Sequence, residues 1–582
     1  MKNSKYQNRE VQPVASIKEM MELAVTQAGD KIAYKYKAGD NIREVTFSVF
    51  SDEVAQLGAF LCDKGIASEH IACIGENSYK WILAYMAVLR SGGVFVPVDR
   101  ELSDAEILNV IRDSDSTVIF YDVKYEELFR KNADKLGGVK YFIGFDRTEK
   151  DGSFLSFDSA LMNGKYADKA GFLDRAPDPD GLKLIIYSSG AAGAAKGVML
   201  TEHNIVSGVY YDLTVSTEYD SELSLLSYHH TYEAVSDVLV SFHNHSTLSI
   251  NDKLTATLKN MVLYKPSHMY VVPAIAESMY KRINKKIKKQ GMEEQFNKLV
   301  EESNALRAKG IDNRREMFGF ILEEFGGRLK KIVCGGAPIK PEVAKFFDDI
   351  GLDLINGYGI TECSPLVCAS HDLYNDFRTA GKSLPGIEWR IDKPNDDGIG
   401  EICVKGDIVT TGYYKRPVLT SDIIRDGWFC TGDYGYINDN GQLIISGRKK
   451  NVIVLKDGKN VYPEEIEECI RDIDYVDDVV VSGDDDTDGN ESSLTAEVYL
   501  KEKKTPGEVF KSIKNACKDL PVYKQVSKVI IREDGSQRTG SKKIIRYIKD
   551  KKDAIAERYS EYRENKESRG SDSDSAGDNQ DQ

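Results

Sequence analysis

The stretch IIYSSGAAGAAKGVMLTEHN, residues 185–204, joins a β-branched apolar run to a loop of glycine, alanine and serine that ends in a lysine. A strand that leads into such a loop exposes backbone N–H groups that can hold phosphate oxygens, and Lys196 adds a positive charge. The loop is not a Walker A motif, because Ala195 precedes the lysine and Gly197 follows it. Taken alone, it fits a phosphate cradle and a flexible turn about equally well.

Helical segments alternate with short apolar runs on the N-terminal side of this loop. The helical pattern of residues 48–65 is followed by the runs HIACIGEN, GGVFVPVD and STVIFYD. Such alternation is typical of helices that pack on a mainly parallel sheet. The sequence therefore predicts an α/β fold with doubly wound layers.

The pattern changes twice along the rest of the chain. Residues 381–447 form short strands between Gly and Asp turns, which predicts a β-barrel-like subdomain. From Arg448 the order of strand, helix and strand starts again. We expect a large domain over residues 1–447, a small α+β domain over 448–550, and a helical extension with a disordered acidic tail over 551–582.

Length and composition narrow the function. A chain of 582 residues exceeds what one hydrophobic core organises, so it has at least two domains. Its 41% hydrophobic and 29% charged residues are typical of a globular protein. The net charge of −15 argues against nucleic acid as a partner, because phosphate backbones are bound by basic surfaces. Nothing in the pattern indicates the oligomeric state.

Membrane and metal signals are weak. The longest apolar run, WILAYMAVL, is far shorter than the ~20 residues of a membrane span, and the N-terminus lacks the apolar core of a signal peptide. We expect a cytoplasmic protein.

The basic run KRINKKIKK, residues 281–289, is typical of a solvated helix face, with a weak peripheral contact to an anionic membrane as the alternative. The nine cysteines form no CxxC pair and are interpreted as buried thiols.

Several glycine-rich and charged motifs follow the loop in a fixed order. They are GGAPI (335–339), NGYGITE (356–362), GEICVKG (400–406), GYYKRP (412–417), GWFCTGDYG (427–435), GRKKNVI (447–453), NVYPEEIE (460–467) and TGSKKIIR (539–546). Together they resemble the adenylate-forming superfamily of acyl-CoA synthetases, adenylation domains and firefly luciferase, over residues 15–548. The segment LSYHHTYE, residues 226–233, looks like the long-chain fatty-acyl-CoA synthetase branch.

The resemblance implies a reaction in two steps. A carboxylate attacks the α-phosphate of ATP to give acyl-AMP and pyrophosphate, and the thiol of coenzyme A then displaces AMP. Neither step requires an enzyme nucleophile, so the protein must position two anions and neutralise the charge between them. ATP, Mg²⁺, coenzyme A and a fatty acid are the expected ligands. The small C-terminal domain is expected to be mobile, with a hinge at Lys450.

The same resemblance assigns site residues. It assigns phosphate contacts to Ser188, Ser189, Gly190, Gly193 and Lys196. It assigns adenine contacts to Gly336, Ala337, Pro338 and Tyr358, and a further cofactor contact to Gly359. The α-phosphate is assigned to Thr361, Mg²⁺ to Glu362, the ribose to Asp433 and Arg448, and the pantetheine channel to Gly458. A carboxylate suits Mg²⁺, which is usually held by one or two carboxylates and substrate phosphates.

Two further residues complete the expected machinery. His230 is expected beside the substrate carboxylate, although a buried structural histidine is nearly as good an interpretation. Lys543 is expected to bridge the carboxylate and the α-phosphate during adenylation, with Lys542 where the family usually has glycine. His243 and His245 are interpreted as polar residues of the surface or core, because two histidines without a third ligand do not make a metal site.

The glycine-rich loop departs from the family pattern. Ala191 and Ala192 stand where the family has Thr or Ser, and losing two such contacts costs on the order of a hundredfold in rate or affinity. The leading hypothesis is an AMP-forming ligase of medium- or long-chain fatty acids. The alternatives are an adenylating ligase for another acid or acceptor thiol, and a catalytically weakened protein that binds nucleotide or acyl ligands. Against an amino-acid substrate, TYEAVSD lacks the Phe-Asp pair that would hold an α-amino group.

Overall fold

The computed structural model describes residues 9–149, 151–188, 195–217, 219–371, 375–455, 459–485 and 491–532. The chain divides into two compact units between Ile445 and Ser446. The predicted α/β class with a smaller second unit is confirmed. The predicted C-terminal motif TGSKKIIR and the acidic tail lie outside the described residues.

The first sheet of the larger unit has eight strands and contains the β8–β9 hairpin that flanks the glycine-rich loop. Its six parallel strands run from β8 to β7, and β9 and β19 extend it in antiparallel fashion. In order the strands are β19 (Gly412–Tyr413), β9 (Lys196–Thr201), β8 (Leu182–Ser188), β4 (Val94–Pro97), β3 (His70–Ile74), β5 (Val118–Tyr121), β6 (Tyr141–Gly144) and β7 (Phe154–Ser156).

The second sheet has nine strands, six of them parallel, with β2, β15 and β16 antiparallel at the two edges. In order they are β16 (Lys382–Ser383), β15 (Leu366–Ala369), β14 (Asp353–Gly359), β13 (Lys331–Cys334), β12 (His268–Val271), β10 (Ser221–Ser224), β11 (Thr247–Ile250), β1 (Ile32–Ala38) and β2 (Asn41–Thr46). The predicted doubly wound layers are thus built on two separate sheets.

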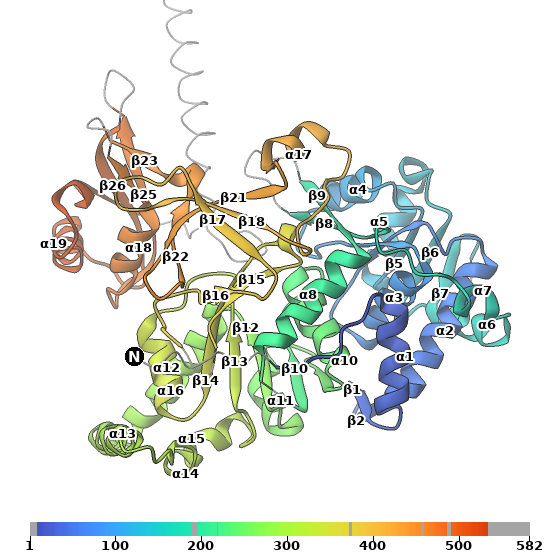
Figure 1. Cartoon of the computed structure of the whole chain (residues 1–582), viewed down its shortest axis with the longest axis horizontal. Helices are drawn as coiled ribbons and strands as arrows, with labels where there is room; N and C mark the ends of the chain where they lie inside the picture. Colours follow the sequence, from blue (N-terminus) through green and yellow to red (C-terminus); the bar gives the residue numbers. More distant parts are fainter. Residues whose placement is uncertain are drawn as a thin grey trace, which may run out of the picture. The chain divides into compact units, whose positions relative to one another are not determined.

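Helices cover these sheets, as Figure 1 shows. Helix α8 (Glu202–Val215) contacts β9 of the first sheet and β15 of the second, so it joins them. The other helices of this unit are α1 (Ile17–Ala28), α2 (Phe47–Asp63), α3 (Tyr79–Ser91), α4 (Asp104–Asp113), α5 (Glu126–Lys131), α6 (Phe157–Tyr166), α7 (Ala170–Leu173), α9 (Thr231–Glu233), the π-helix η3 (Ala234–Leu239), α10 (Val240–His243), α11 (Thr257–Tyr264), α12 (Pro273–Lys289), α13 (Glu293–Arg307), α14 (Arg314–Met317), α15 (Gly319–Leu322), α16 (Pro341–Asp349) and α17 (Pro417–Ile423).

The longest apolar run of the sequence becomes the central core helix. Every residue of α3 except Lys80 is buried, which explains why WILAYMAVL has no polar face. Ser78 caps the helix by accepting the N–H of Trp81, and Gly92 ends it with a φ of 84°. Among the described residues, no helix combines the length and apolar character needed to cross a bilayer.

The predicted β subdomain is an antiparallel sheet of five strands. They are β17 (Glu388–Asp392), β18 (Gly400–Lys405), β21 (Trp428–Ile437), β20 (Ile424–Arg425) and β22 (Leu443–Arg448), which pairs with β21. Their pairing follows an open path. Cys403 and Cys430 face each other across β18 and β21, and all nine cysteines are free.

The second unit repeats strand, helix and strand over its described part. It contains β23 (Ile453–Val454), β24 (Asn460–Val461), α18 (Pro463–Arg471), β25 (Val476–Asp485), β26 (Glu491–Leu500), α19 (Pro506–Ala516) and β27 (Lys528–Arg532). Strands β25, β26 and β27 form one sheet, and β23 pairs with β24. Helices α18 and α19 bury Ile466, Ile470, Val509 and Ile513 in the core of this unit.

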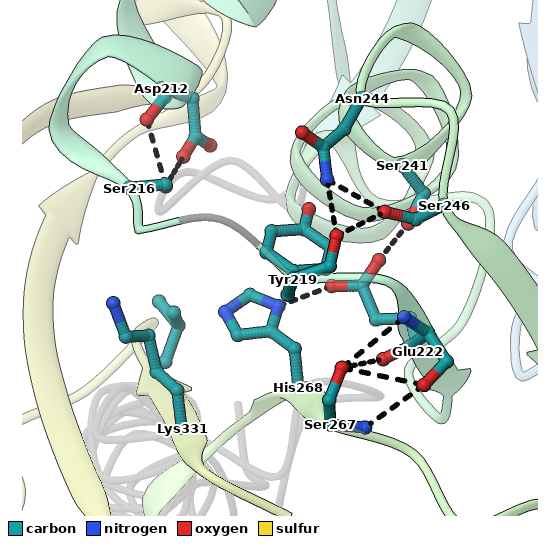
Figure 2. Close-up of polar contacts among 12 residues, drawn as sticks. Asp212, Ser216, Tyr219, Glu222, Ser241, Asn244, Ser246, Ser267, His268 and Lys331 are labelled. Atoms are coloured by element: carbon teal, nitrogen blue, oxygen red, sulfur yellow. Dashed lines mark hydrogen bonds and ion pairs between the residues drawn. The ribbon is translucent and has the colours of Figure 1, made fainter. Parts of the chain in front are cut away.

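A buried polar cluster lies beneath the second sheet, at the N-terminal ends of β10, β12 and β13. Figure 2 shows the Tyr219 ring stacked on His268, with centroids 4.1 Å apart, and His268 Nδ1 lies 2.5 Å from Glu222 Oε1. Asp212 of α8 is buried nearby and accepts a hydrogen bond from the Ser216 hydroxyl at 3.4 Å. Burial raises the pKa of Asp212 to about 7, so its neutral form is favoured in the folded protein.

Asp212 should make folding stability depend on pH. Its folded pKa of about 7 exceeds the ~3.9 of an unfolded aspartate, so its contribution is complete below about pH 4 and is lost as the pH rises to about 7. We expect Asp212→Asn to remove up to about 4 kcal/mol of this loss. Urea unfolding between pH 4.5 and 7.5 measures the effect. Asp180→Asn, at an exposed loop position, is the control, and an unchanged pH slope in Asp212→Asn would contradict the assignment.

Candidate functional site

Most of the predicted site residues of the larger unit lie at the carboxyl ends of parallel strands, whereas Lys196 begins β9 and Asp433 lies within β21. His230 follows β10, the segment 336–338 follows β13, and Tyr358 and Gly359 end β14, just before Thr361 and Glu362. Because β10, β12, β13 and β14 are consecutive neighbours, these segments share one edge of the sheet. This edge is where ligands bind in open α/β sheets.

A lysine, a tyrosine and a glutamate connect the two sheets. Lys196 Nζ donates to the Tyr413 hydroxyl at 2.7 Å and lies 4.3 Å from the centre of its ring. The Tyr413 hydroxyl donates in turn to Glu362 Oε1 at 2.7 Å. Both Tyr413 and Glu362 are buried. The Tyr413 hydroxyl therefore links the ammonium group of Lys196, on the β8–β9 hairpin, to the carboxylate of Glu362 just after β14.

The position of Glu362 is also fixed through its backbone. Its carbonyl accepts the N–H of Thr410 at 2.8 Å, and the Thr410 hydroxyl donates to the Met199 carbonyl of β9 at 2.6 Å. The segment before β19 therefore ties η6 (Thr361–Cys363) to the hairpin by a second route. Two independent links hold the carboxylate of Glu362 near Lys196.

Tyr358 and Asp433 form a second buried pair. The Tyr358 hydroxyl donates to Asp433 Oδ2 at 2.6 Å, and the Asp433 backbone N–H donates to the Thr431 hydroxyl at 3.0 Å. Burial, followed by the charge of Asp433, raises the pKa of Tyr358 well above its ordinary value, so its hydroxyl keeps its proton at neutral pH. The residues predicted for adenine and ribose thus lie within one hydrogen bond of each other.

Steric constraints explain why the GGAPI motif has glycine at positions 335 and 336. A Cβ on Gly335 would lie 3.2 Å from the Tyr232 ring, whose hydroxyl donates to the carbonyls of Val271 and Val333 at 3.2 Å each. Gly336 has a φ of 83°, which is strained for residues with a side chain. Ala337 and Pro338 are exposed beside it. The motif therefore forms an exposed wall at the end of β13.

Gly359 is explained by packing at the end of β14. A Cβ there would lie 2.6 Å from the carbonyl oxygen of Pro365, so any larger residue would displace the chain that returns as β15. The structure thus gives Gly359 a local structural role. Its predicted contact with the nucleotide stays a prediction.

His230 lies beside Thr361 through a neighbouring residue. The Thr231 hydroxyl is 3.5 Å from the Thr361 hydroxyl, and the rings of His229 and His230 are 4.0 Å apart. His229 Nε2 lies 3.4 Å from Asp99 Oδ1, in the segment after β4. Burial, and then the charge of His230, lowers the pKa of His229 well below its ordinary value, so its ring is neutral at neutral pH.

Glu233 holds the segment that carries these histidines. Its Oε1 accepts the backbone N–H groups of Leu225 at 2.9 Å and Leu226 at 3.0 Å, directly after β10. Burial, and then the charge of Asp237, raises the pKa of Glu233 well above its ordinary value, so it acts as a neutral acid at pH 7. Its place three residues after His230 in HHTYE was the only sequence signal for this role.

The remaining residues singled out in the sequence fall into four groups. Ser189, Gly190, Gly193, Gly458 and Lys543 lie outside the described residues, as do Ala191 and Ala192. Ser188 is described through its backbone, which pairs with Lys196. Arg448 belongs to the second unit, at the start of the turn that includes Lys450. His243 is a buried polar residue whose Nε2 lies 2.9 Å from the Gln12 carbonyl.

Sequence reasoning missed Tyr413 and Thr231 as site residues. Both stand inside motifs that were recognised, GYYKRP and HHTYE, but spacing alone does not distinguish Tyr413 from Tyr414. The Tyr414 hydroxyl has a different partner, because it donates to Asp115 Oδ2 at 2.7 Å. Only the pairing of β19 with β9 shows which tyrosine reaches Glu362.

Comparison with known proteins agrees with this arrangement. Residues 21–414 match the family model described as AMP-binding enzyme, which is more than half of the chain. The chain therefore belongs to the AMP-binding enzyme family. Predicted membership of this family is confirmed.

Curated relatives are fatty-acid ligases of moderate similarity. The long-chain-fatty-acid–CoA ligase FadD15 of Mycobacterium tuberculosis is 28% identical over 471 residues, covering 76% of this chain and 75% of the relative. Long-chain-fatty-acid–CoA ligase 5 of Rattus norvegicus is 28% identical over 483 residues, covering 76% and 70%. The chloroplastic long-chain-fatty-acid–[acyl-carrier-protein] ligase AEE15 of Arabidopsis thaliana is 28% identical over 538 residues, covering 78% and 73%.

Solved structures share the fold. The o-succinylbenzoate coenzyme A synthetase of Bacillus subtilis in complex with AMP has a TM-score of 0.71 and 21% identity, covering 91% of this chain and 97% of that one. The anthranilate CoA ligase AuaEII in complex with anthranoyl-AMP has a TM-score of 0.73 and 17% identity, covering 94% and 98%. Both are enzymes that form or bind adenylates by their descriptions.

Glu233 should tolerate an amide but not an alkyl group. Glu233→Gln keeps a neutral acceptor for the two N–H groups, whereas Glu233→Leu leaves both unpaired at a cost of about 1–3 kcal/mol each. We expect the leucine variant to lose at least about 2 kcal/mol of unfolding free energy at pH 7 and the glutamine variant less than about 1 kcal/mol. Chemical denaturation measures both values. Equal losses in the two variants would show that the carboxyl does not act as this acceptor.

Proposed function

We propose that this member of the AMP-binding enzyme family is an ATP-dependent acid:CoA ligase. It activates a medium- or long-chain fatty acid as acyl-AMP, with release of pyrophosphate, and then transfers the acyl group to coenzyme A with release of AMP. The observation that carries the proposal is the chain of contacts from Lys196 through Tyr413 to Glu362, beside the Tyr358–Asp433 pair. The names of the curated relatives support the fatty acid and the thiol acceptor.

The described residues fit the charge changes of adenylation. Lys196 offers a cation at the β-hairpin, where the phosphates of ATP would lie, and Tyr413 orients it without cancelling its charge. Thr361 offers a hydroxyl at the same sheet edge for the α-phosphate. Such fixed charges and dipoles lower a barrier because they need no rearrangement as charge moves from the carboxylate to pyrophosphate.

Glu362 fits a magnesium site that is completed by the substrate. It is a buried carboxylate, and one of its oxygens already accepts from Tyr413, so the other is the group it offers to a cation. Among the described residues, no group of three or more His, Cys, Asp or Glu side chains could hold a metal by itself. This suits Mg²⁺, which binds proteins through one or two carboxylates together with phosphates. The metal would neutralise phosphate charge when bound.

The nucleotide contacts follow the same edge. Asp433 accepts from Tyr358, and its carboxylate would also accept from the ribose hydroxyls, since a carboxylate has about four lone-pair sites. The exposed wall of residues 336–338 would cover one face of the adenine. His230 would lie next to the acid that attacks the α-phosphate.

The acceptor and location complete the proposal. The Arabidopsis relative named as an acyl-carrier-protein ligase favours a carrier-protein thiol as the second candidate acceptor. The assignments of Gly458 to the pantetheine channel, of Arg448 to the ribose and of Lys450 to a hinge belong to the proposal for coenzyme A. The cytoplasmic location also stays a proposal.

Product analysis across a panel of acids tests the function. The protein is incubated with ATP, Mg²⁺ and either coenzyme A or holo-acyl-carrier protein, with acids from acetate to palmitate, benzoate and amino acids. We expect acyl-CoA, AMP and pyrophosphate in equal amounts with medium or long fatty acids. Transfer to carrier protein alone would favour the second acceptor, and no product with any acid would favour a nucleotide-binding protein weakened at Ala191 and Ala192.

Acyl-AMP formation should require the hydroxyl of Tyr413 and not only its ring. Tyr413→Phe keeps the ring but removes the hydroxyl that Lys196 and Glu362 share. Charge-assisted hydrogen bonds contribute about 1.5–3 kcal/mol, so we expect kcat/KM for acyl-AMP formation to fall about 10- to 150-fold. Tyr414→Phe, which loses its bond to Asp115, is the matched control and should stay near wild type. Equal activities of the two variants would contradict the proposed role.

Lys543 should separate the two half-reactions. If it bridges the carboxylate and the α-phosphate, Lys543→Ala should abolish acyl-AMP formation from ATP. The variant should retain much of the transfer to coenzyme A from supplied acyl-AMP. Both half-reactions are followed by liquid chromatography of the nucleotides. A parallel loss of both would contradict a role confined to adenylation.

A further inference from the structure

A basic pocket lies at the far end of the β8–β9 hairpin from the glycine-rich loop. It has a volume of about 190 Å³ and we call it the hairpin pocket. Its charged lining residues are Lys18, Arg90, Arg175, Asp178, Lys183 and Glu202. Lys183 is near the start of β8 and Glu202 follows the end of β9, so five strand steps, about 16 Å, separate Lys183 from Ser188. The pocket is therefore distinct from the nucleotide site.

Two of these cations are buried. Lys183 is 3% exposed and Arg90 is 8% exposed. Burying a cation is costly unless a partner compensates, so each should have an anion close by. Lys183 has Glu202 at 3.6 Å, and its Nζ also donates to the Leu89 carbonyl at 2.9 Å.

Arg90 is much less satisfied than Lys183. Within the described part of the chain, its only hydrogen bond runs from Nη2 to the Leu173 carbonyl at 2.9 Å, and its guanidinium lies 5.0 Å from the centre of the Phe172 ring. A guanidinium carries five N–H donors, so most of its donors face the pocket without a protein acceptor. Among the described residues it has no carboxylate within ion-pair distance.

The charges of the lining do not balance. Four cations face two carboxylates, and Glu202 is already engaged, because its Oε1 accepts the Ile17 N–H at 2.8 Å and its Oε2 faces Lys183. Burial lowers the pKa of both Arg90 and Lys183; the charges of Glu22 and Glu202 oppose this shift at Arg90, and the charge of Glu202 opposes it at Lys183. Glu22, just outside the lining, lies 3.9 Å from Lys18, so the four cations exceed the three nearby carboxylates by about one charge.

The backbone keeps Arg175 over the pocket. Gly92 ends α3 in the left-handed region, and a Cβ there would lie 3.2 Å from Arg175 Nε. The Arg175 side chain thus packs against a residue without a side chain, and its Nη2 donates to the Ser68 hydroxyl. Arg175 is therefore held at the pocket, where its remaining N–H donors and those of Arg90 can bind the same ligand.

We propose that the hairpin pocket binds a small anion of the phosphate class through Arg90, Arg175 and Lys183. Two guanidinium groups match the oxygen geometry of phosphate, and the excess of positive charge around the pocket favours an anion. A cavity of about 190 Å³ has room for a phosphate group and a short attachment. The ligand is either free phosphate or the phosphate of a small monoester.

Calorimetric titration of the full chain at constant ionic strength tests the proposal. The probes are inorganic phosphate, glycerol 3-phosphate and succinate, which carries two negative charges without phosphate geometry. We expect one site that binds at least one of the two phosphates and binds succinate at least tenfold more weakly. Tighter binding of the monoester than of phosphate would identify an esterified ligand, and the reverse order would identify the free ion.

Variants locate the site. Arg175→Gln, at a half-buried position, should weaken phosphate binding at least tenfold, and Arg90→Gln should act in the same direction. Arg112→Gln, on the exposed side of α4, is the matched control and should bind as wild type does. Three results would overturn the proposal. They are unchanged phosphate affinity in Arg175→Gln, succinate binding as tight as phosphate binding, and no binding to the wild type at phosphate concentrations of about 10 mM. If Arg90→Gln does not fold, Arg175→Gln decides.

Discussion

The Tyr413 hydroxyl is the contact on which the candidate site depends. It accepts from Lys196 on the hairpin of one sheet and donates to Glu362 at the end of the other. Without it, a buried carboxylate and a lysine would have to be held by longer, independent contacts. Because the hydroxyl is neutral, it fixes both charged groups in place without neutralising either of them. The same edge of the second sheet then places Thr361, Tyr358 and the wall after β13 around one region.

The interior beneath this edge is unusually acidic. Glu222, Glu233 and Asp237 are fully buried on or beside β10, and burial raises the pKa of each, to about 6 for Asp237. Buried carboxyls are tolerated when they are neutral and hydrogen-bonded, as Glu233 is by two backbone N–H groups. The cost of keeping them is stability that decreases as the pH rises. Glu233 shows what such a residue contributes, because its hydrogen bonds to Leu225 and Leu226 fix the segment that carries His230.

Much of the fold was predictable because its signals are local. The apolar runs that become β3, β4 and β5 and the periodicity of α2 report their own structure, and ordered motifs identified the family. What could not be predicted depends on contacts across the chain. Tyr413 and Tyr414 are adjacent and chemically identical, and only the pairing of β19 with β9 separates their roles. Arg90 gave no signal at all, since its significance lies in partners from α7 and β8 that the sequence does not place beside it.

The central claim is that the site activates an acid as an adenylate before any thiol takes part. Exchange of labelled pyrophosphate into ATP, measured without coenzyme A, tests this most directly, because it requires reversible formation of acyl-AMP. The account predicts exchange that depends on both Mg²⁺ and a fatty acid. Release of ADP and phosphate in place of this exchange, or exchange that is independent of added acid, would contradict it.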